Sequence, residues 1–414
     1  MSQRVGVVCR WGMTTQHQGA ARPDRVRPRH RVVVLGAGYA GLLAAKRLAA
    51  RVFTDEVEVT LVNASAAFVE RPRLHQVATG QPIPAVELGA LLAGTGVRLV
   101  VGTVTDLDLG ARTVLARADG TTRRLGYDTL IYALGSQIDP DQVPGVLEHA
   151  HVLNDVAAAD RLAKRLKAAG GSRVVVCGGG LTGIEVAAEI AESHPDLRVA
   201  LVSADRPGGW LSLPAQRYLD RVMGQLGITV RAGTRVASVE NDHMILEDGE
   251  RAAADICVWA GGFSVPDLAT RAGLEVTSGG RAVVDGSMRS RSHPEVYAIG
   301  DAAAISGSWG SELAMGCRTG GATGPKVADV VAAVLTGRPP AGSMRYRYVH
   351  ECISLGRRRG LVQFLHADET PRDRILTGRV AMLYKNATLR GALLLFAWPG
   401  PYVAPRRHLA AAAR

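Results

Sequence analysis

A chain of 414 residues that is 47% hydrophobic can bury more than one core, and its length favours two or three domains. Its net charge of +11 rests on 44 arginines and only five lysines, while aromatic residues make up 5%, too few for the stacking platforms of a nucleic-acid-binding protein. No apolar run approaches the roughly 20 residues of a spanning helix, so no transmembrane anchor is expected. The charge is interpreted as a solvated arginine-rich surface, with attraction to anionic lipid or phosphorylated cofactors as the alternative.

The first 30 residues are irregular and arginine-rich from Ala21 to Arg31, without the apolar stretch of a signal peptide. We expect residues 1–30 to be a disordered basic extension, with Met13 as an alternative start.

Five cysteines are spread along the chain: Cys9, Cys177, Cys257, Cys317 and Cys352. The nearest two are 35 residues apart, so no CxxC or CxxxxC pair exists. An odd, sparse set is typical of a reducing cytoplasm, and a cytoplasmic protein without a metal site is predicted.

The segment Arg31 to Ala50, RVVVLGAGYAGLLAAKRLAA, reads as a strand, a glycine turn and a helix, with a second strand at Val57 to Asn63. Gly36 permits the tight turn, Gly38 lets the backbone approach a pyrophosphate, and Gly41 allows close helix packing. The helix N-terminus then faces the phosphates, so this unit predicts a dinucleotide site. Further strands are expected at Val97 to Val104, Thr113 to Ala118 and Thr129 to Gly135.

The segment Arg173 to Ile190, RVVVCGGGLTGIEVAAEI, repeats the pattern, followed by a strand at Leu197 to Ser203. Its glycines are Gly178, Gly180 and Gly183, and the two units start 142 residues apart. The chain is therefore expected to hold two nucleotide sites. Glu185 on the second helix lies near the nicotinamide or belongs to an ordinary helix face.

A dinucleotide site usually has an acid at the end of its second strand to bind the adenosine ribose. The first unit has Asn63 there and the second has Ser203. With Arg206 nearby the second site would tolerate a 2′-phosphate, whereas Asp205 keeps the choice between NADH and NADPH open.

After the second unit, strands are expected at Ile228 to Val239, Met244 to Glu247, Ile256 to Gly261 and Val296 to Gly300, the last ending in Asp301. A carboxylate at a strand end can accept hydrogen bonds from hydroxyl groups. Further on, Gly320, Gly321 and Gly324 with Pro325 should weaken any helix.

This arrangement resembles the flavoproteins with two dinucleotide-binding domains, which include disulfide reductases, ferredoxin reductases and type II NADH dehydrogenases. YDTLIYALGS (127–136) and DICVWAGG (255–262) look like the strands that close the two domains, and HPEVYAIGDAAA (293–304) looks like the second FAD fingerprint. The resemblance implies an α/β fold with two Rossmann-like domains, the FAD domain being split by an inserted NAD(P) domain, plus a smaller C-terminal α+β region. The expected parts are residues 31–150 and 271–337 for FAD, 151–270 for NAD(P) and 338–414 for a C-terminal interface or membrane-surface region.

The resemblance also implies site residues. For FAD they are Gly36, Gly38, Tyr39, Ala40, Gly41, Asn63, Arg71, Arg73, Val104, Ala133, Leu134, Gly135, Gly300, Asp301 and Ala314. For NADH or NADPH they are Gly178, Gly180, Leu181, Thr182, Gly183, Glu185, Ser203, Arg206, Gly261 and Gly262. The catalytic candidates are Glu185, Cys317 and Arg318.

The branch of the family is harder to assign. FVERPRLHQVATG (68–80) stands where disulfide reductases carry CxxxxC, so thiol relay by that route is excluded. That segment, with ECISLGRRRGLVQF (351–364) and LYKNATLRGALLLFAWPG (383–400), resembles actinobacterial type II NADH dehydrogenase-like proteins, whose flavin reduces a quinone. However, residues 312–331 lack the glutamines that bind the quinone headgroup in that family, and Cys317 and Arg318 take their place.

The C-terminal apolar run, Ala392 to Trp398, could lie in a membrane interface but cannot cross one. A packed helix or a homodimer contact is the alternative. The leading function is an FAD-dependent NAD(P)H dehydrogenase with a quinone or small organic acceptor. A tailoring flavoenzyme of secondary metabolism, a low-turnover NAD(P)H sensor and a sulfide:quinone enzyme using Cys317 and Cys352 stay open.

Overall fold

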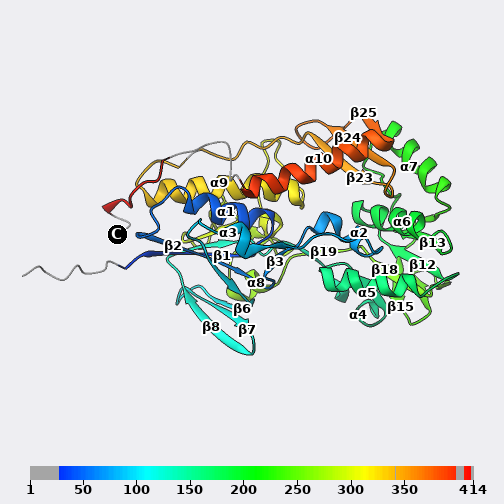
Figure 1. The fold of residues 1–414 in the computed structure, drawn as a ribbon, viewed down its shortest axis with the longest axis horizontal. Helices are drawn as coiled ribbons and strands as arrows, with labels where there is room; N and C mark the ends of the chain where they lie inside the picture. The colour runs from blue at the N-terminus through cyan, green and yellow to red at the C-terminus, as the bar shows by residue number, and fades with distance from the viewer. Residues whose placement is uncertain (1–27, 341, 398–404, 412–414) are drawn as a thin grey trace, which may run out of the picture.

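The computed structural model describes residues 28–340, 342–397 and 405–411 (Figure 1). Most of the extension expected at 1–30, including Met13, lies outside the described residues, as does Trp398 of the apolar run.

Two parallel five-stranded sheets form the centre of the molecule. The first has the order β21 (Val296–Ala298), β9 (Thr129–Tyr132), β1 (His30–Leu35), β2 (Val57–Asn63) and β5 (Arg98–Val101). The second has the order β11 (Ala150–Val152), β18 (Ile256–Trp259), β12 (Arg173–Cys177), β13 (Arg198–Ser203) and β14 (Thr229–Ala232). Their central strands are apolar and buried, as parallel strands covered on both faces must be.

The first sheet is built from two separate stretches of chain, because β21 follows the whole second sheet in sequence yet pairs with β9. The short strands β10 (Gln137–Ile138) and β19 (Phe263–Ser264) lie on the two connections and pair with each other. The predicted fold class, with one Rossmann-like half inserted into the other, is therefore confirmed.

Helices cover the sheets. Beside the first sheet lie α1 (Tyr39–Ala49), α3 (Leu88–Leu92), α8 (Leu268–Ala272) and α9 (Cys317–Leu335), and beside the second lie α2 (Leu74–Val77), α4 (Val146–His149), α5 (Val156–Lys167), α6 (Leu181–Ser193) and α7 (Leu213–Gln225) (Figure 1). Each half also has a three-stranded antiparallel sheet. In the first half it consists of β6 (Thr103–Asp108), β7 (Thr113–Ala118) and β8 (Thr121–Gly126), and in the second half of β15 (Val236–Val239), β16 (His243–Leu246) and β17 (Arg251–Ala253). Two-stranded pairs join β3 (Ala67–Phe68) to β4 (Val86–Glu87) and β20 (Ala282–Val283) to β22 (Ala303–Ala304).

Two stretches that the sequence predicts as single strands are divided. Val97 to Val104 forms β5 and then β6, because the chain leaves the parallel sheet at Gly102, where an added Cβ would lie 2.9 Å from the carbonyl oxygen of Arg117. Ile228 to Val239 forms β14 and β15, separated at Gly233, whose φ is +70°.

The expected weakening of a helix after Gly316 is wrong, because α9 runs for 19 residues with Pro325 inside it. Its glycines bring it close to α1: a Cβ on Gly324 would lie 2.3 Å from the carbonyl oxygen of Ala40. The close packing of the two helices outweighs the poor helix propensity of glycine.

The C-terminal region is an antiparallel sheet of β23 (His350–Ser354), β24 (Gly360–Leu365) and β25 (Pro371–Thr377), followed by α10 (Gly378–Ala397). It extends over both halves at the top of Figure 1. Gly360 allows α10 to pack closely against β24, because a Cβ at this position would lie 3.0 Å from the backbone nitrogen of Met382. Over the residues that the structure describes, α10 and every other helix are too short or too polar to cross a bilayer.

Candidate nucleotide-binding and redox site

The first glycine turn connects β1 to α1. Gly36 has φ +94°, and a Cβ there would lie 2.4 Å from the carbonyl oxygen of Ala133. A Cβ on Gly41 would lie 1.9 Å from the carbonyl oxygen of Gly36, so both positions require glycine. Gly38 instead faces open space, with nothing within 4 Å of its Cβ position. No side chain caps the N-terminus of α1 at Gly38 and no acid lies in its first turn, so the turn fits a pyrophosphate group.

The second turn repeats this geometry between β12 and α6. Gly178 has φ +122°, and a Cβ on Gly183 would lie 1.8 Å from its carbonyl oxygen. Gly180 has open space around it and N-caps α6 without a side-chain bond, followed by the half-buried Leu181 and Thr182. The backbone nitrogen of Gly261, after β18, lies 2.8 Å from the Cβ position of Gly178, and Gly262 has φ +69°. The two sheets thus carry equivalent cradles at the carboxyl ends of their central strands.

Asn63 and Arg206, expected near the adenosine ribose of the two nucleotides, form hydrogen bonds or ion pairs within the protein. Asn63 accepts a hydrogen bond from the backbone N–H of Ala37 at 2.9 Å and donates to the carbonyl oxygen of Ser65 at 2.8 Å, so its amide braces the first turn. In the second half Ser203 is buried, whereas Arg206 is exposed and pairs with Asp220 at 2.6 Å. Arg206 is accessible to a 2′-phosphate, which would have to displace Asp220.

Asp301 lies where β21 ends, beside the N-terminus of α9. Its carboxylate accepts hydrogen bonds from the Ser136 hydroxyl and from the backbone N–H of Gly316, both at 2.6 Å. Gly300 and Gly135 take the left-handed conformation on either side of this position, with φ +64° and +71°. Arg71 donates to the carbonyl oxygen of Ser136; burial lowers the pKa of its guanidinium, and the charge of Asp301 opposes that shift. The structure thus joins Arg71, Gly135, Gly300 and Asp301 in one site.

The other residues expected to bind FAD have the following surroundings. Tyr39 packs its ring against Phe68 at 5.1 Å and against Phe396 of α10 at 5.6 Å, and its buried hydroxyl has no partner among the described residues. The short side chain of Ala40 is buried against α9, and Val104 is half-buried against the first core. Arg73 donates to the side chain of Gln76 at 3.0 Å. Leu134 is half-buried, its Cα 3.3 Å from the Cβ position of Gly36.

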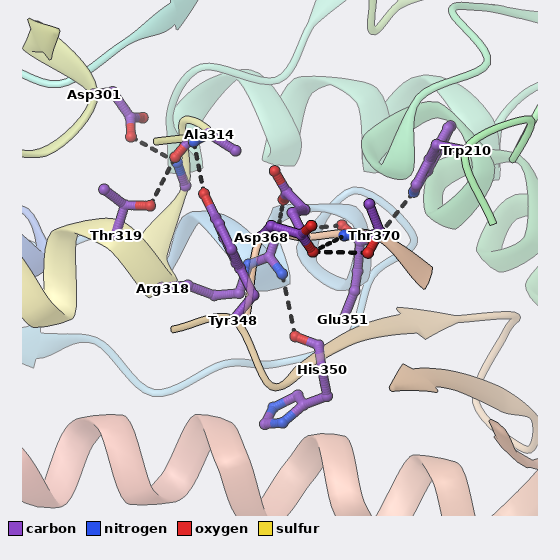
Figure 2. A network of polar contacts seen from close by, with 12 residues as sticks. Trp210, Asp301, Ala314, Arg318, Thr319, Tyr348, His350, Glu351, Asp368 and Thr370 are labelled. Carbon is purple, nitrogen blue, oxygen red and sulfur yellow. Dashed lines mark hydrogen bonds and ion pairs between the residues drawn. The ribbon is translucent and has the colours of Figure 1, made fainter. Parts of the chain in front are cut away.

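A polar network connects the N-terminus of α9 to the C-terminal sheet (Figure 2). Arg318 donates to the carbonyl oxygen of His350 at 3.1 Å and to Glu369 at 2.8 Å, and it lies over the ring of Tyr348. The backbone N–H of Ala314, expected at the flavin, donates to the Tyr348 hydroxyl at 2.7 Å. Arg318 is therefore held by protein groups, and its catalytic role stays a prediction.

The network continues into the second half. Glu351 lies 3.6 Å from Arg318 and accepts a hydrogen bond from the indole of Trp210 at 2.8 Å (Figure 2). Trp210 follows β13, so the chain of contacts links the two nucleotide-binding halves.

The two cysteines near α9 are poorly suited to thiolate chemistry. Desolvation by the surrounding protein raises the pKa of the Cys317 thiol, and burial raises that of Cys352 to about 12. Both thiols are protonated at neutral pH, which weakens them as nucleophiles.

Glu185 is part of a buried cluster that the sequence did not predict. It is 2% exposed, accepts hydrogen bonds from the backbone N–H of Ser354 at 2.7 Å and from the Lys385 ammonium, and lies 3.6 Å from His75. Lys385 also donates to the Ser354 hydroxyl at 2.6 Å. Burial lowers the pKa of His75 to about 4, so its imidazole is neutral at pH 7.

A signal for this cluster existed in the sequence. Lys385 is one of five lysines in a chain with 44 arginines, and it lies four residues after Ala381, on the face of α10 that is buried. The cluster ties α6 to the C-terminal region, so the carboxylate of Glu185 braces the helix that carries the second cradle. That Glu185 lies near a bound nicotinamide stays a prediction.

Comparison with known proteins agrees with this geometry. Residues 30–333 match the family described as pyridine nucleotide-disulphide oxidoreductase. The type II NADH:quinone oxidoreductase Ndh of Mycobacterium tuberculosis is 30% identical over 380 residues, 81% of this chain and 79% of that protein. NdhA of the same organism, also a type II NADH:quinone oxidoreductase, is 30% identical over 337 residues, 68% of each chain.

Among solved structures, the sulfide:quinone oxidoreductase of Aquifex aeolicus superimposes with a TM-score of 0.74 at 18% identity, over 91% of this chain and 93% of that one. This likeness concerns the fold alone. With two open glycine cradles, a carboxylate beside the first of them and a family match over most of its length, the chain belongs to the pyridine nucleotide-disulphide oxidoreductases.

Proposed function

We propose that the protein binds FAD at the first cradle and NADH or NADPH at the second, and passes electrons from the nicotinamide through the flavin to a quinone or another small acceptor. Family membership implies binding of both nucleotides. The observation that carries the proposal is the pair of cradles, in which Gly38 and Gly180 leave open space at the N-termini of α1 and α6. Without a CxxxxC pair, electrons would leave the flavin directly rather than through a disulfide.

The residues around the first cradle fit FAD. The carboxylate of Asp301 would accept hydrogen bonds from ribityl hydroxyls, and the unpartnered hydroxyl of Tyr39 offers a further polar contact. Arg71 and the helix N-terminus would offset the negative charge of the pyrophosphate. When bound, FAD supplies hydride acceptance at its ring system.

The residues of the second half would orient the nicotinamide. The turn at Gly178 to Gly183 would hold the pyrophosphate, and Gly261 and Gly262 would border the ring. Glu185, tied to Lys385, would fix the angle of α6 relative to the C-terminal region.

The acceptor side supports a second candidate. Arg318 is committed to Glu369, His350 and Tyr348, and it stands where the related quinone-reducing family has glutamine. A pocket altered in this way would suit a small organic substrate of a tailoring enzyme as well as a quinone. A low-turnover NAD(P)H sensor is the third candidate function, which the experiment must distinguish from the other two.

Anaerobic mixing of the purified holoprotein with NADH or NADPH tests the proposal. An enzyme should bleach its flavin absorbance within seconds, and the preferred nucleotide should do so at the lower concentration. Second mixing with menadione, ferricyanide or a ferredoxin ranks the acceptors. Reoxidation by none of them faster than by air would leave only the tailoring or sensing role, and a colourless protein that does not take up FAD would contradict both.

We also propose that the C-terminal segment contacts a membrane surface peripherally. α10 exposes Val380, Leu383, Leu394 and Leu395, with exposed fractions from 43% to 69%. Flotation with liposomes should weaken when residues 390–414 are deleted, because Leu394 and Leu395 are then removed. If the protein instead elutes as a dimer that depends on the same residues, the segment is a subunit contact.

A further inference from the structure

A small arginine-lined cavity lies at the C-terminal sheet. It measures about 280 Å³ and is lined by Arg347, Tyr348, Val349, Phe364, Arg372 and Arg374, among others. Arg372 and Arg374 of β25 both line this cavity, and Phe364 of β24 lies beside them. The guanidinium of Arg374 lies over the Phe364 ring, 5.4 Å from its centroid.

None of the three guanidinium groups has a carboxylate within ion-pair distance over the residues that the structure describes. Asp373, which lies between Arg372 and Arg374 in sequence, does not line the cavity. Glu369, the nearest acid before the strand, is bound by Arg318. Three like charges around one cavity repel one another, and a bound anion would offset that repulsion.

The surface beside the cavity is apolar. Val349 lines the cavity and is 59% exposed, while Val380 and Leu383 of α10 are 60% and 69% exposed. Tyr384, the residue after Leu383, lies with its ring 6.4 Å from that of Phe364 and bonds His350 at 3.1 Å, so this part of α10 adjoins the cavity. Unpaired arginines next to exposed aliphatic side chains complement a phosphate group that is attached to a hydrocarbon chain.

We propose that the cavity formed by Arg347, Arg372 and Arg374 binds the phosphodiester headgroup of an anionic phospholipid. The inference rests on the peripheral membrane contact proposed above and gives it a specific binding site. Bidentate guanidinium contacts would hold the phosphate, Val349 and Leu383 would contact the acyl boundary, and Tyr348 would lie between the bound lipid and Arg318 at the flavin side.

The test is co-sedimentation of the FAD-loaded full-length protein with vesicles of phosphatidylcholine alone or containing about one third phosphatidylglycerol. The variant Arg347→Gln/Arg372→Gln/Arg374→Gln removes the site. A matched control, Arg117→Gln/Arg123→Gln/Arg124→Gln, removes the same charge from the exposed strands β7 and β8. Affinity for the anionic vesicles should fall roughly fivefold for each arginine removed from the site, about a hundredfold for all three. The control should bind within about twofold of the wild type, because screening confines the interaction to nearby charges.

Equal losses in the two variants would mean that delocalised charge attracts the membrane, and would overturn the site. Wild-type binding by the site variant would do the same. A third arm adds inorganic phosphate or glycerol 3-phosphate: if either binds the wild type at micromolar concentration while the vesicles do not, the ligand is a soluble phosphate and the lipid assignment is wrong. Bleaching of the flavin by NADH in solution, measured on the same preparations, reports on the proposed redox function separately from lipid binding.

Discussion

At the scale of single residues, the ion pair between Glu185 and Lys385 is the most consequential buried contact. Both side chains are at least 95% buried, and Ser354 bonds each of them. Lys385→Met would leave the carboxylate buried with a single hydrogen bond, and we expect it to lower the free energy of unfolding by about 3–5 kcal/mol. Glu185→Gln/Lys385→Met should recover most of that loss, because no charge is then left unpaired. Chemical denaturation of the four proteins of this cycle measures the coupling, and additive losses would contradict a direct pair.

His75 beside this pair should make stability depend on pH. Burial lowers its pKa from 6.5 to about 4, so between these values the unfolded chain binds a proton that the folded chain does not. Its contribution is therefore complete above pH 6.5 and is lost as the pH falls towards 4, by about 3 kcal/mol. His75→Leu removes the titrating group, and its unfolding free energy should fall less than that of the wild type between pH 7 and pH 4.5. Parallel curves for the two proteins would show that the pKa of His75 is the same in the folded and the unfolded chain, which would contradict the shift.

At the scale of elements, the packing of α1 against α9 depends on one glycine. A Cβ on Gly324 would lie 2.3 Å from the carbonyl oxygen of Ala40 and 3.2 Å from the Cβ of Leu43. Gly324→Ala should therefore push the helices apart, destabilise the fold by about 1–3 kcal/mol and lower the FAD content, because α1 begins at the first cradle. Gly321→Ala is the matched control in the same helix: its Cβ meets nothing within 4 Å, and alanine should stabilise the helix slightly. Melting temperature and the ratio of absorbance at the flavin band to that of the protein give the two readouts.

The sequence predicted strands and turns correctly where the conformation of the segment depends on its own residues rather than on packing. The ranges predicted for β2 and β7 agree with the structure at both ends, and both glycine turns have the conformations that their spacing requires. Tertiary packing decided the rest. The glycines of α9 would weaken an isolated helix, and only the structure shows that α1 packs against them. Similarly, Lys385, the partner of Glu185, is 200 residues away in sequence. Asn63 could be placed at the end of β2, but its bond to Ala37 follows only from the geometry of the turn.

At the scale of the whole molecule, the C-terminal region holds the two nucleotide-binding halves together. It contacts the second half through Glu185 with Lys385 and through Trp210 with Glu351, and the first half through Arg318 with Glu369. If a nicotinamide and a flavin bind to separate halves as proposed, they can react only while those halves keep a fixed distance, and these contacts would then serve electron transfer. The region is thus a brace between the cradles, and the proposed lipid site lies at its sheet.

If the brace works in this way, Arg318→Leu should loosen the C-terminal sheet without unfolding either half. The substitution removes the contacts to Glu369 and the His350 carbonyl group and leaves Glu369, whose pKa is already raised by burial, without its counter-charge. Amide hydrogen exchange should quicken in β23 to β25, while protection in β1 and β12 is retained. In rapid mixing, the rate of flavin reduction by NADH should fall, whereas the affinity for FAD should change little, since Asp301 and the first glycine turn are intact. Trp210→Phe, which deletes the hydrogen bond to Glu351 and keeps a smaller aromatic ring, should shift exchange in the same direction by a smaller amount. Faster exchange throughout β1 as well would mean that Arg318 supports the whole first half, and the brace would then not be a separate unit.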